Sequence, residues 1–311
     1  MVIADLGGTE ILAELGDPTK QAEISRCLDN LKKSDNGWKT AIQKILEGAT
    51  TNFQEYFLLL QVVEDYLNKR YCNGGPEETQ IIREFLNYWI KIVVSNSTTE
   101  TPAFVTNKMA QIFSLVFAVD FPEKWPSFFQ DLFFCNNLLD RNFALFYLRF
   151  LEAINSEVVD RDVHRPKEHF DRNTKIKDAM REICILQIAQ SWTPILAAVS
   201  DSVVQCLVLD MIAAYVDWID TELVANDVVM PAIIERLANA ETCESAVNAV
   251  SGLLQKGMPE EKKGELTLTV LRVLWSNNLL NINAESNEDE IIRVGSLANT
   301  VGQVLVDVAT K

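Results

Sequence analysis

The segment Asp120-Phe-Pro-Glu-Lys-Trp-Pro-Ser-Phe-Phe129 follows a long apolar run and interrupts it with two prolines. Proline has no backbone N–H and stops the helix before it, yet it suits the first turn of the helix that follows. The four aromatic side chains of the segment can fill a tight corner between two helices. The segment therefore predicts helices that fold back on one another, with Trp125 buried at the corner.

Apolar residues recur at helical spacing over nearly the whole chain, and no sustained alternation typical of strands is present. Prolines and polar residues that favour helix starts, such as Thr51 or Asn52, separate the periodic stretches. The pattern predicts helices over about 53–71 and 102–121, one continuous helix over 172–198, and another over 222–238. An all-α fold follows.

The expected helix pairs recur along the chain at a nearly constant interval. Their starts near Asp35, Pro76, Glu123, Arg172, Thr221 and Glu260 are separated by 41, 47, 49, 49 and 39 residues. HEAT-type repeats recur at roughly 40–47 residues. The spacing predicts an α-solenoid of HEAT-type antiparallel helix pairs, wound as a right-handed superhelix. No residue signature repeats with the interval, so a compact helical domain with accidental spacing stays an alternative.

The composition points to a folded, acidic protein. Of 311 residues, 48 % are apolar, and 44 Asp and Glu residues against 28 Lys and Arg residues give a formal charge of −16. Such a charge repels phosphate backbones and attracts basic partners, although acidity can also serve solubility alone. The six cysteines contain no C-x-x-C pair, which argues against a disulfide framework and a zinc site.

The chain offers little for catalysis. It contains no phosphate-binding glycine motif and no nucleophile elbow, and His164 and His169 are its two histidines. The sequence therefore predicts a non-enzyme with no catalytic residues, no metal site and no cofactor of its own. The richest apolar run, 57–63, is far shorter than a membrane span, and the N-terminus has no basic region of a signal peptide. We expect no membrane insertion.

Residues 155–182 differ in net charge from the acidic remainder of the chain. They hold seven basic and seven acidic residues, so basic side chains are concentrated there. One interpretation is a loop and helix start that contact the phosphates of a nucleic acid. The other is a segment of alternating charges that form ion pairs with one another. The candidate phosphate-binding residues are Arg161, Arg165, Arg172, Lys175 and Lys177.

Several blocks of the sequence resemble a known family. Phe104–Gln111, together with the aromatic corner, resembles nuclear export receptors of the importin-β superfamily. More specific blocks resemble the tRNA export receptors within that superfamily, and this similarity is continuous from about Trp38 to the C-terminal helix. These more specific blocks are Val158–Val163, Arg172–Glu182, Ala214–Asp220 and Leu223–Asp227.

The resemblance implies a receptor that binds mature tRNA together with the GTP-bound GTPase Ran in the nucleus. It further implies contact with nuclear pore proteins, release of both partners after GTP hydrolysis in the cytoplasm, and shuttling between the two compartments. The GTP and its magnesium would belong to Ran. In the superfamily the first repeats hold Ran with side chains of their inner helices. The matching candidates here are Gln61, Glu64, Asp65, Asn107, Lys108 and Gln111. Considered alone, they could simply be solvated faces of amphipathic helices.

The resemblance also divides the chain. Residues 1–33 would be a helical cap, 34–158 repeats 1–3 with the Ran-binding region, and 159–311 repeats 4–6. Receptors of this family are much longer and have a C-terminal arch that holds cargo, so we expect an N-terminal portion whose tRNA binding requires that arch. The rival hypothesis is a helical-repeat scaffold or adaptor that binds a basic protein without Ran or RNA.

Overall fold

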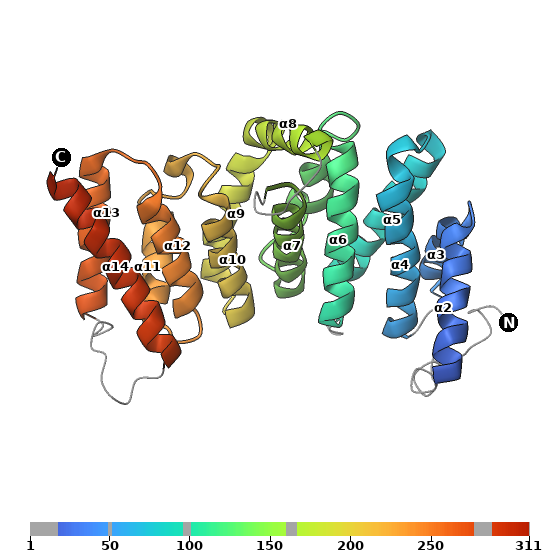
Figure 1. The fold of residues 1–311 in the computed structure, drawn as a ribbon, viewed down its shortest axis with the longest axis horizontal. Coiled ribbons are helices and arrows are strands. Elements are labelled where there is room, and N and C mark those ends of the chain that lie inside the picture. The colour runs from blue at the N-terminus through green and yellow to red at the C-terminus, as the bar shows by residue number, and fades with distance from the viewer. Residues whose placement is uncertain (1–17, 49–51, 96–100, 160–166, 277–287, 311) are drawn as a thin grey trace. The chain divides into compact units, whose positions relative to one another are not determined.

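The computed structural model describes residues 18–48, 52–95, 101–159, 167–276 and 288–310, and within these ranges it contains helices and no strand. The all-α class and the stacked helix pairs of a helical-repeat solenoid are confirmed (Figure 1). The right-handed sense of the superhelix stays a prediction. The chain forms two compact units, Met1–Asn137 with Arg149–Ile176, and Leu138–Leu148 with Lys177–Lys311. The expected boundaries after residues 33 and 158 stay predictions.

The first unit begins with two helices that pack on α4. Asn52 caps α4, because its side-chain oxygen accepts a hydrogen bond from the Gln54 backbone N–H at 2.8 Å, as its residue type led us to expect. α4 packs on α3 on one side and on α6 on the other (Figure 1). The helices of this part are α2 (Pro18–Lys33), α3 (Gly37–Leu46), α4 (Phe53–Lys69), α5 (Pro76–Ser95) and α6 (Ala103–Asp120).

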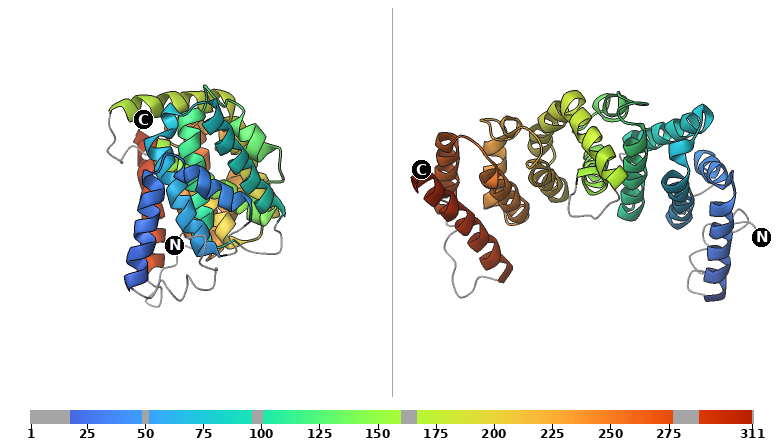
Figure 2. Two further views of the ribbon diagram at one scale, coloured as in Figure 1. Left: turned by 90° about the vertical axis from the view of Figure 1, so that its right-hand side faces the viewer. Right: turned by 45° about the horizontal axis from the view of Figure 1, so that its top comes forward.

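The second unit arranges its helices in two rows. α10, α12 and α14 contact one another in sequence, and α9 contacts α11. In the second view of Figure 2, α14 runs beside α13. Helices α7 (Arg141–Ile154) and α8 (Lys167–Ile183) contribute to both units. The other helices of the second unit are α9 (Ile185–Ala198), α10 (Ser202–Tyr215), α11 (Val229–Glu235), α12 (Cys243–Gln255), α13 (Glu260–Ser276) and α14 (Glu288–Thr310).

Two predicted helices are wrong in extent. The continuous helix over 172–198 is broken at Cys184, whose φ of −134° leaves the helical region and separates α8 from α9. The helix over 222–238 begins only at Val229. Asn226 causes this late start, because its side-chain oxygen accepts hydrogen bonds from the Val228 and Val229 N–H groups, each at 3.0 Å.

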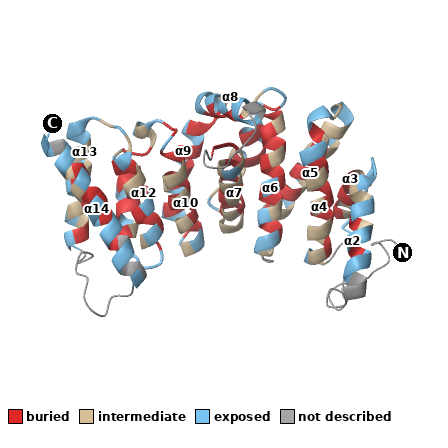
Figure 3. Ribbon diagram, in the orientation of Figure 1, coloured by how far each residue is buried: buried red, intermediate tan, exposed pale blue. Residues whose placement is uncertain are grey.

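Buried residues form stripes along the helices in both units (Figure 3). In the first unit the core is a cluster of phenylalanines from α6, the corner and α7. Phe133 and Phe150 stack with ring centroids 4.7 Å apart, and Phe117 meets Phe128 edge-on at 5.3 Å. In the second unit Trp192, Tyr215 and Trp218 form a smaller cluster.

Trp125 lies at the corner as expected and is 5 % exposed, which confirms its predicted burial. Its ring meets Phe128 edge-on at 4.7 Å, and its indole N–H donates to Asp131 Oδ2 at 2.7 Å. The Arg83 guanidinium from α5 lies 4.6 Å above the ring centroid. The side chain therefore joins the corner to the preceding helix pair by packing, a hydrogen bond and a cation–π contact.

Next to Trp125, the fully buried Asp120 carboxylate forms the polar centre of the corner. The Tyr71 hydroxyl donates to its Oδ2 at 2.8 Å, and the Arg83 and Lys124 cations each lie 3.9 Å from one of its oxygens. Burial raises the pKa of the Asp120 carboxyl, and the Tyr71 hydrogen bond and the two cations oppose that rise.

Trp125→Ala is expected to lower the free energy of unfolding by about 3–5 kcal/mol, as large core truncations do. The matched control is Trp275→Ala, because Trp275 is 80 % exposed and its loss should change stability by no more than about 0.5 kcal/mol. Denaturant unfolding followed by circular dichroism measures both variants. Equal losses in the two variants would contradict the role of Trp125.

Asp120→Asn tests the buried carboxylate through pH. A carboxyl whose pKa is raised by folding contributes stability that is fully present below the ordinary aspartate pKa and is lost as pH rises through the raised value. The unfolding free energy of the wild type minus that of the variant should therefore be largest in acid and fall toward neutral pH. A difference that grows with pH would show that the cations dominate over burial.

Candidate functional site

The surface shared by α4 and α6 holds the candidate Ran-binding residues, and Lys108 is its centre. Its ammonium donates to Glu64 Oε2 on α4 at 2.8 Å and to Gln111 Oε1 on its own helix at 2.8 Å. The side chains of Lys108 and Glu64 are 15 % and 19 % exposed. The pair is partly desolvated but still reachable from solvent.

The other three candidates lie on the same two helices without joining this hydrogen-bonded group. Asp65 forms an ion pair with Lys69 at 2.6 Å, one turn further along α4. Gln61 is half-buried one turn before Glu64, and Asn107 is exposed on α6. The structure thus brings Glu64, Lys108 and Gln111 together and places Gln61, Asp65 and Asn107 around them.

An aromatic group at the start of these two helices was missed by sequence reasoning. Phe57 and Phe104 meet edge-on with centroids 5.5 Å apart, and the Lys108 ammonium lies 5.6 Å from the Phe57 ring centroid. Phe53 and Phe104 remain 41 % and 43 % exposed. The spacing of Phe53 and Phe57, one helical turn apart, indicated that both lie on the same face of a helix. The sequence did not indicate that this face is exposed to solvent.

The described part of the basic segment makes contacts within the protein, and its binding of phosphates stays a prediction. Arg161 and Arg165 lie outside the described residues. Arg172 donates to Glu157 Oε1 at 3.1 Å and to the Asn173 side chain, and Lys177 is buried with 8 % of its surface exposed. Lys175 is exposed on α8. Of the described candidates, Lys175 thus presents its charge most openly to solvent.

Further contacts around α8 support the ion-pair interpretation. Asn173, also buried, donates to the Glu157 backbone carbonyl at 3.0 Å. This bond connects α8 to the short π-helix Asn155–Val159 that follows α7. Arg181 pairs with Asp178 at 2.5 Å and donates to the Trp218 carbonyl at 3.0 Å. Arg172 and Arg181 therefore stabilise loops and helix ends of this protein.

The described residues contain no group of three or more His, Cys, Asp or Glu side chains able to hold a metal ion. His169 is exposed, while His164 lies outside the described part. The cysteines are free thiols, and burial raises the pKa of Cys184 to about 12, so that thiol is unreactive at neutral pH. Among the helices that are described, none is both long and apolar enough to cross a membrane.

Comparison with known proteins gives a consistent family. The model of the family "Exportin 1-like protein" matches residues 102–250. The chain is 34 % identical over 280 residues to the protein named Exportin-T from Danio rerio, and equally so to the one from Homo sapiens. It is 27 % identical over 288 residues to the Exportin-T of Arabidopsis thaliana.

These alignments cover 89 % of this chain but only 28–29 % of the relatives, so the chain spans less than a third of their length. An alignment over 89 % of the chain includes residues of both compact units. The stacked helix pairs agree with the helical-repeat architecture of the matched family. The chain belongs to the exportin-T family, within the importin-β superfamily of helical-repeat proteins.

Proposed function

We propose that this chain is part of a nuclear export receptor for tRNA that binds Ran-GTP and releases its partners after GTP hydrolysis in the cytoplasm. The observation that carries the proposal is the similarity to proteins named Exportin-T over 89 % of the chain. Such a receptor works by reversible binding, so it is not an enzyme and needs no cofactor of its own. It would shuttle between nucleus and cytoplasm and contact nuclear pore proteins.

In this proposal Ran-GTP binds the α4–α6 surface. The Lys108 and Glu64 side chains are 15 % and 19 % exposed, so charged groups of a partner can still reach the pair. A partner with complementary charges would be oriented by it. The neighbouring Phe57 and Phe104 rings supply apolar area, which interface centres usually need.

The contribution to tRNA binding is proposed to be small and to lie around Lys175. Arg172 already pairs with Glu157, and Lys177 is buried, so phosphates would have to displace internal contacts to reach them. Arg161 and Arg165 remain proposed contacts. The chain's charge of −16 opposes phosphates overall.

One prediction of the proposed function concerns Ran. Reversing two charges in the variant Glu64→Lys/Asp65→Lys should weaken Ran-GTP binding by about 10-fold, because complementary charges steer and orient a partner. The matched control is Glu84→Lys/Glu123→Lys, which changes two exposed acidic residues of the same unit outside α4 and α6 by the same net charge. Titration by fluorescence anisotropy measures both, with circular dichroism to verify helicity.

Equal affinities of the two double variants would remove the α4–α6 surface from the Ran site. Binding of wild type to Ran-GDP as tightly as to Ran-GTP would instead favour the scaffold hypothesis, because only a transport receptor requires the triphosphate state. Basic proteins would then be the partners to test.

The second prediction concerns tRNA. This chain alone should bind tRNA at about 150 mM salt no more tightly than non-specific binding, roughly 10⁻⁴–10⁻⁶ M. Lys175→Glu should weaken that residual binding and reduce its salt dependence, whereas Lys262→Glu, on α13, should not. Sub-micromolar affinity without Ran would contradict the proposed small contribution.

A further inference from the structure

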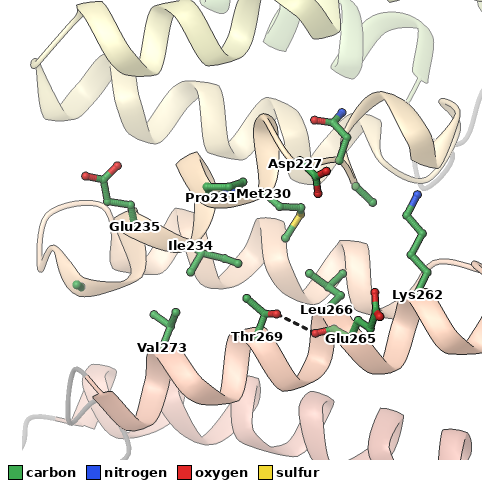
Figure 4. A pocket seen from close by; sticks show the side chains of 13 residues that line it. Asp227, Met230, Pro231, Ile234, Glu235, Lys262, Glu265, Leu266, Thr269 and Val273 are labelled. Atoms are coloured by element: carbon green, nitrogen blue, oxygen red, sulfur yellow. Dashed lines mark hydrogen bonds between the residues drawn. The ribbon is translucent and has the colours of Figure 1, made fainter.

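The second unit contains an open groove between α11 and α13 that no part of the proposed function uses (Figure 4). Its volume is about 690 Å³. This lies within the range of roughly 300–1,000 Å³ that ligand sites occupy. The apolar residues lining it are Met230, Pro231 and Ile234 from α11 and Leu266 and Val273 from α13.

The groove follows from the short length of α11. α11 has only seven residues, because Asn226 delays its start to Val229 and the 3₁₀ helix Arg236–Ala238 follows it. α13, with 17 residues, extends well beyond it, and both helices are supported by α12. Leu266 and Val273 on α13 are therefore only half-buried.

The shape of the groove suits a helix better than a compact small molecule. The lining residues on α13 run from Lys262 to Val273, a span of about 16 Å at the rise of an α-helix. That length accommodates two turns of a bound helix, which would present apolar residues at positions i, i+3 or i+4, and i+7.

The rim of the groove is acidic. Asp227 and Glu265 are exposed at its edge, while Glu235 pairs with Arg236 at 2.7 Å and Lys262 is the lining cation. The surrounding unit strengthens this field, since residues 138–148 and 177–311 hold 20 acidic against 10 basic residues. A basic ligand is attracted to such a rim, and a phosphate-bearing one is repelled.

We propose that the α11–α13 groove binds an amphipathic, basic helical segment of a protein partner. Its apolar stripe would cover Pro231, Leu266 and Val273, the apolar lining residues that keep accessible surface, and its Lys or Arg residues would face Asp227 and Glu265. The site is independent of the surfaces proposed for Ran and tRNA, so failure of either proposal leaves the other intact.

The probe is a synthetic 15-residue peptide with leucines at helical spacing i, i+4 and i+7 and lysines on the opposite face. One control peptide has the same composition in scrambled order, and a second has glutamate in place of every lysine. Fluorescence anisotropy with the 311-residue chain should show the probe binding at least about 10-fold more tightly than either control. Equal binding of the scrambled peptide would overturn the helical groove, because only general charge attraction would remain.

Variants locate the site. Asp227→Lys/Glu265→Lys reverses the rim, and Thr269→Trp fills the groove from its exposed lining position; each should weaken the probe by about 10-fold. The control Glu182→Lys/Asp307→Lys changes the net charge of the same unit equally at exposed positions outside the groove, and should change affinity less than about 2-fold. Circular dichroism verifies the fold of each. An equal loss in the control, or no loss in Thr269→Trp, would overturn the proposal.

Discussion

The buried carboxylate of Asp120 sets the constraint on which the first unit depends. It ends α6, accepts a hydrogen bond from Tyr71 just after α4, and lies between the Arg83 and Lys124 cations. An uncompensated charge in a core is severely destabilising, so these groups hold α4, α5 and α6 in one register. The phenylalanines of α6 and α7 pack on Phe128 of the corner beside this arrangement.

The same register creates the α4–α6 surface. With the C-terminal ends of both helices tied together at Tyr71 and Asp120, Lys108 lies opposite Glu64 and beside the Phe57 ring. The Lys108–Glu64 pair is still reachable from solvent, whereas the buried network of Asp120 at the helix ends contributes to stability through the geometry it enforces. In the proposed receptor, stability would thus depend on the C-terminal ends of these helices, and Ran binding on the surface around Lys108.

The sequence predicted the helix pairs of the first unit well, because Pro76, Pro102 and the 120–129 corner interrupt strong apolar stripes. The prediction failed where the end of a helix is not marked by a proline or another helix-breaking residue. Ile183, Cys184 and Ile185 continue an apolar pattern although the backbone leaves the helix at Cys184. Asn226 was a readable capping residue, but the apolar residues before it concealed the helix start. Burial of Lys177 and the α11–α13 groove depend on contacts between distant segments, which periodicity does not encode.

Basic and acidic side chains of this chain differ in how many of them make internal contacts, and this difference bears on the kind of partner that suits its surface. The arginines on α8 make contacts within the protein. Arg172 forms an ion pair with Glu157, and Arg181 forms one with Asp178 and donates a hydrogen bond to the Trp218 backbone carbonyl. By contrast, acidic groups such as Asp227 and Glu265 stay exposed beside apolar area. Apolar area gives affinity and the surrounding acids give selectivity against phosphates, so these surfaces suit basic protein faces more than nucleic acid. In the described part of the basic segment Lys175 is exposed, so the tRNA contact proposed for this chain stays small.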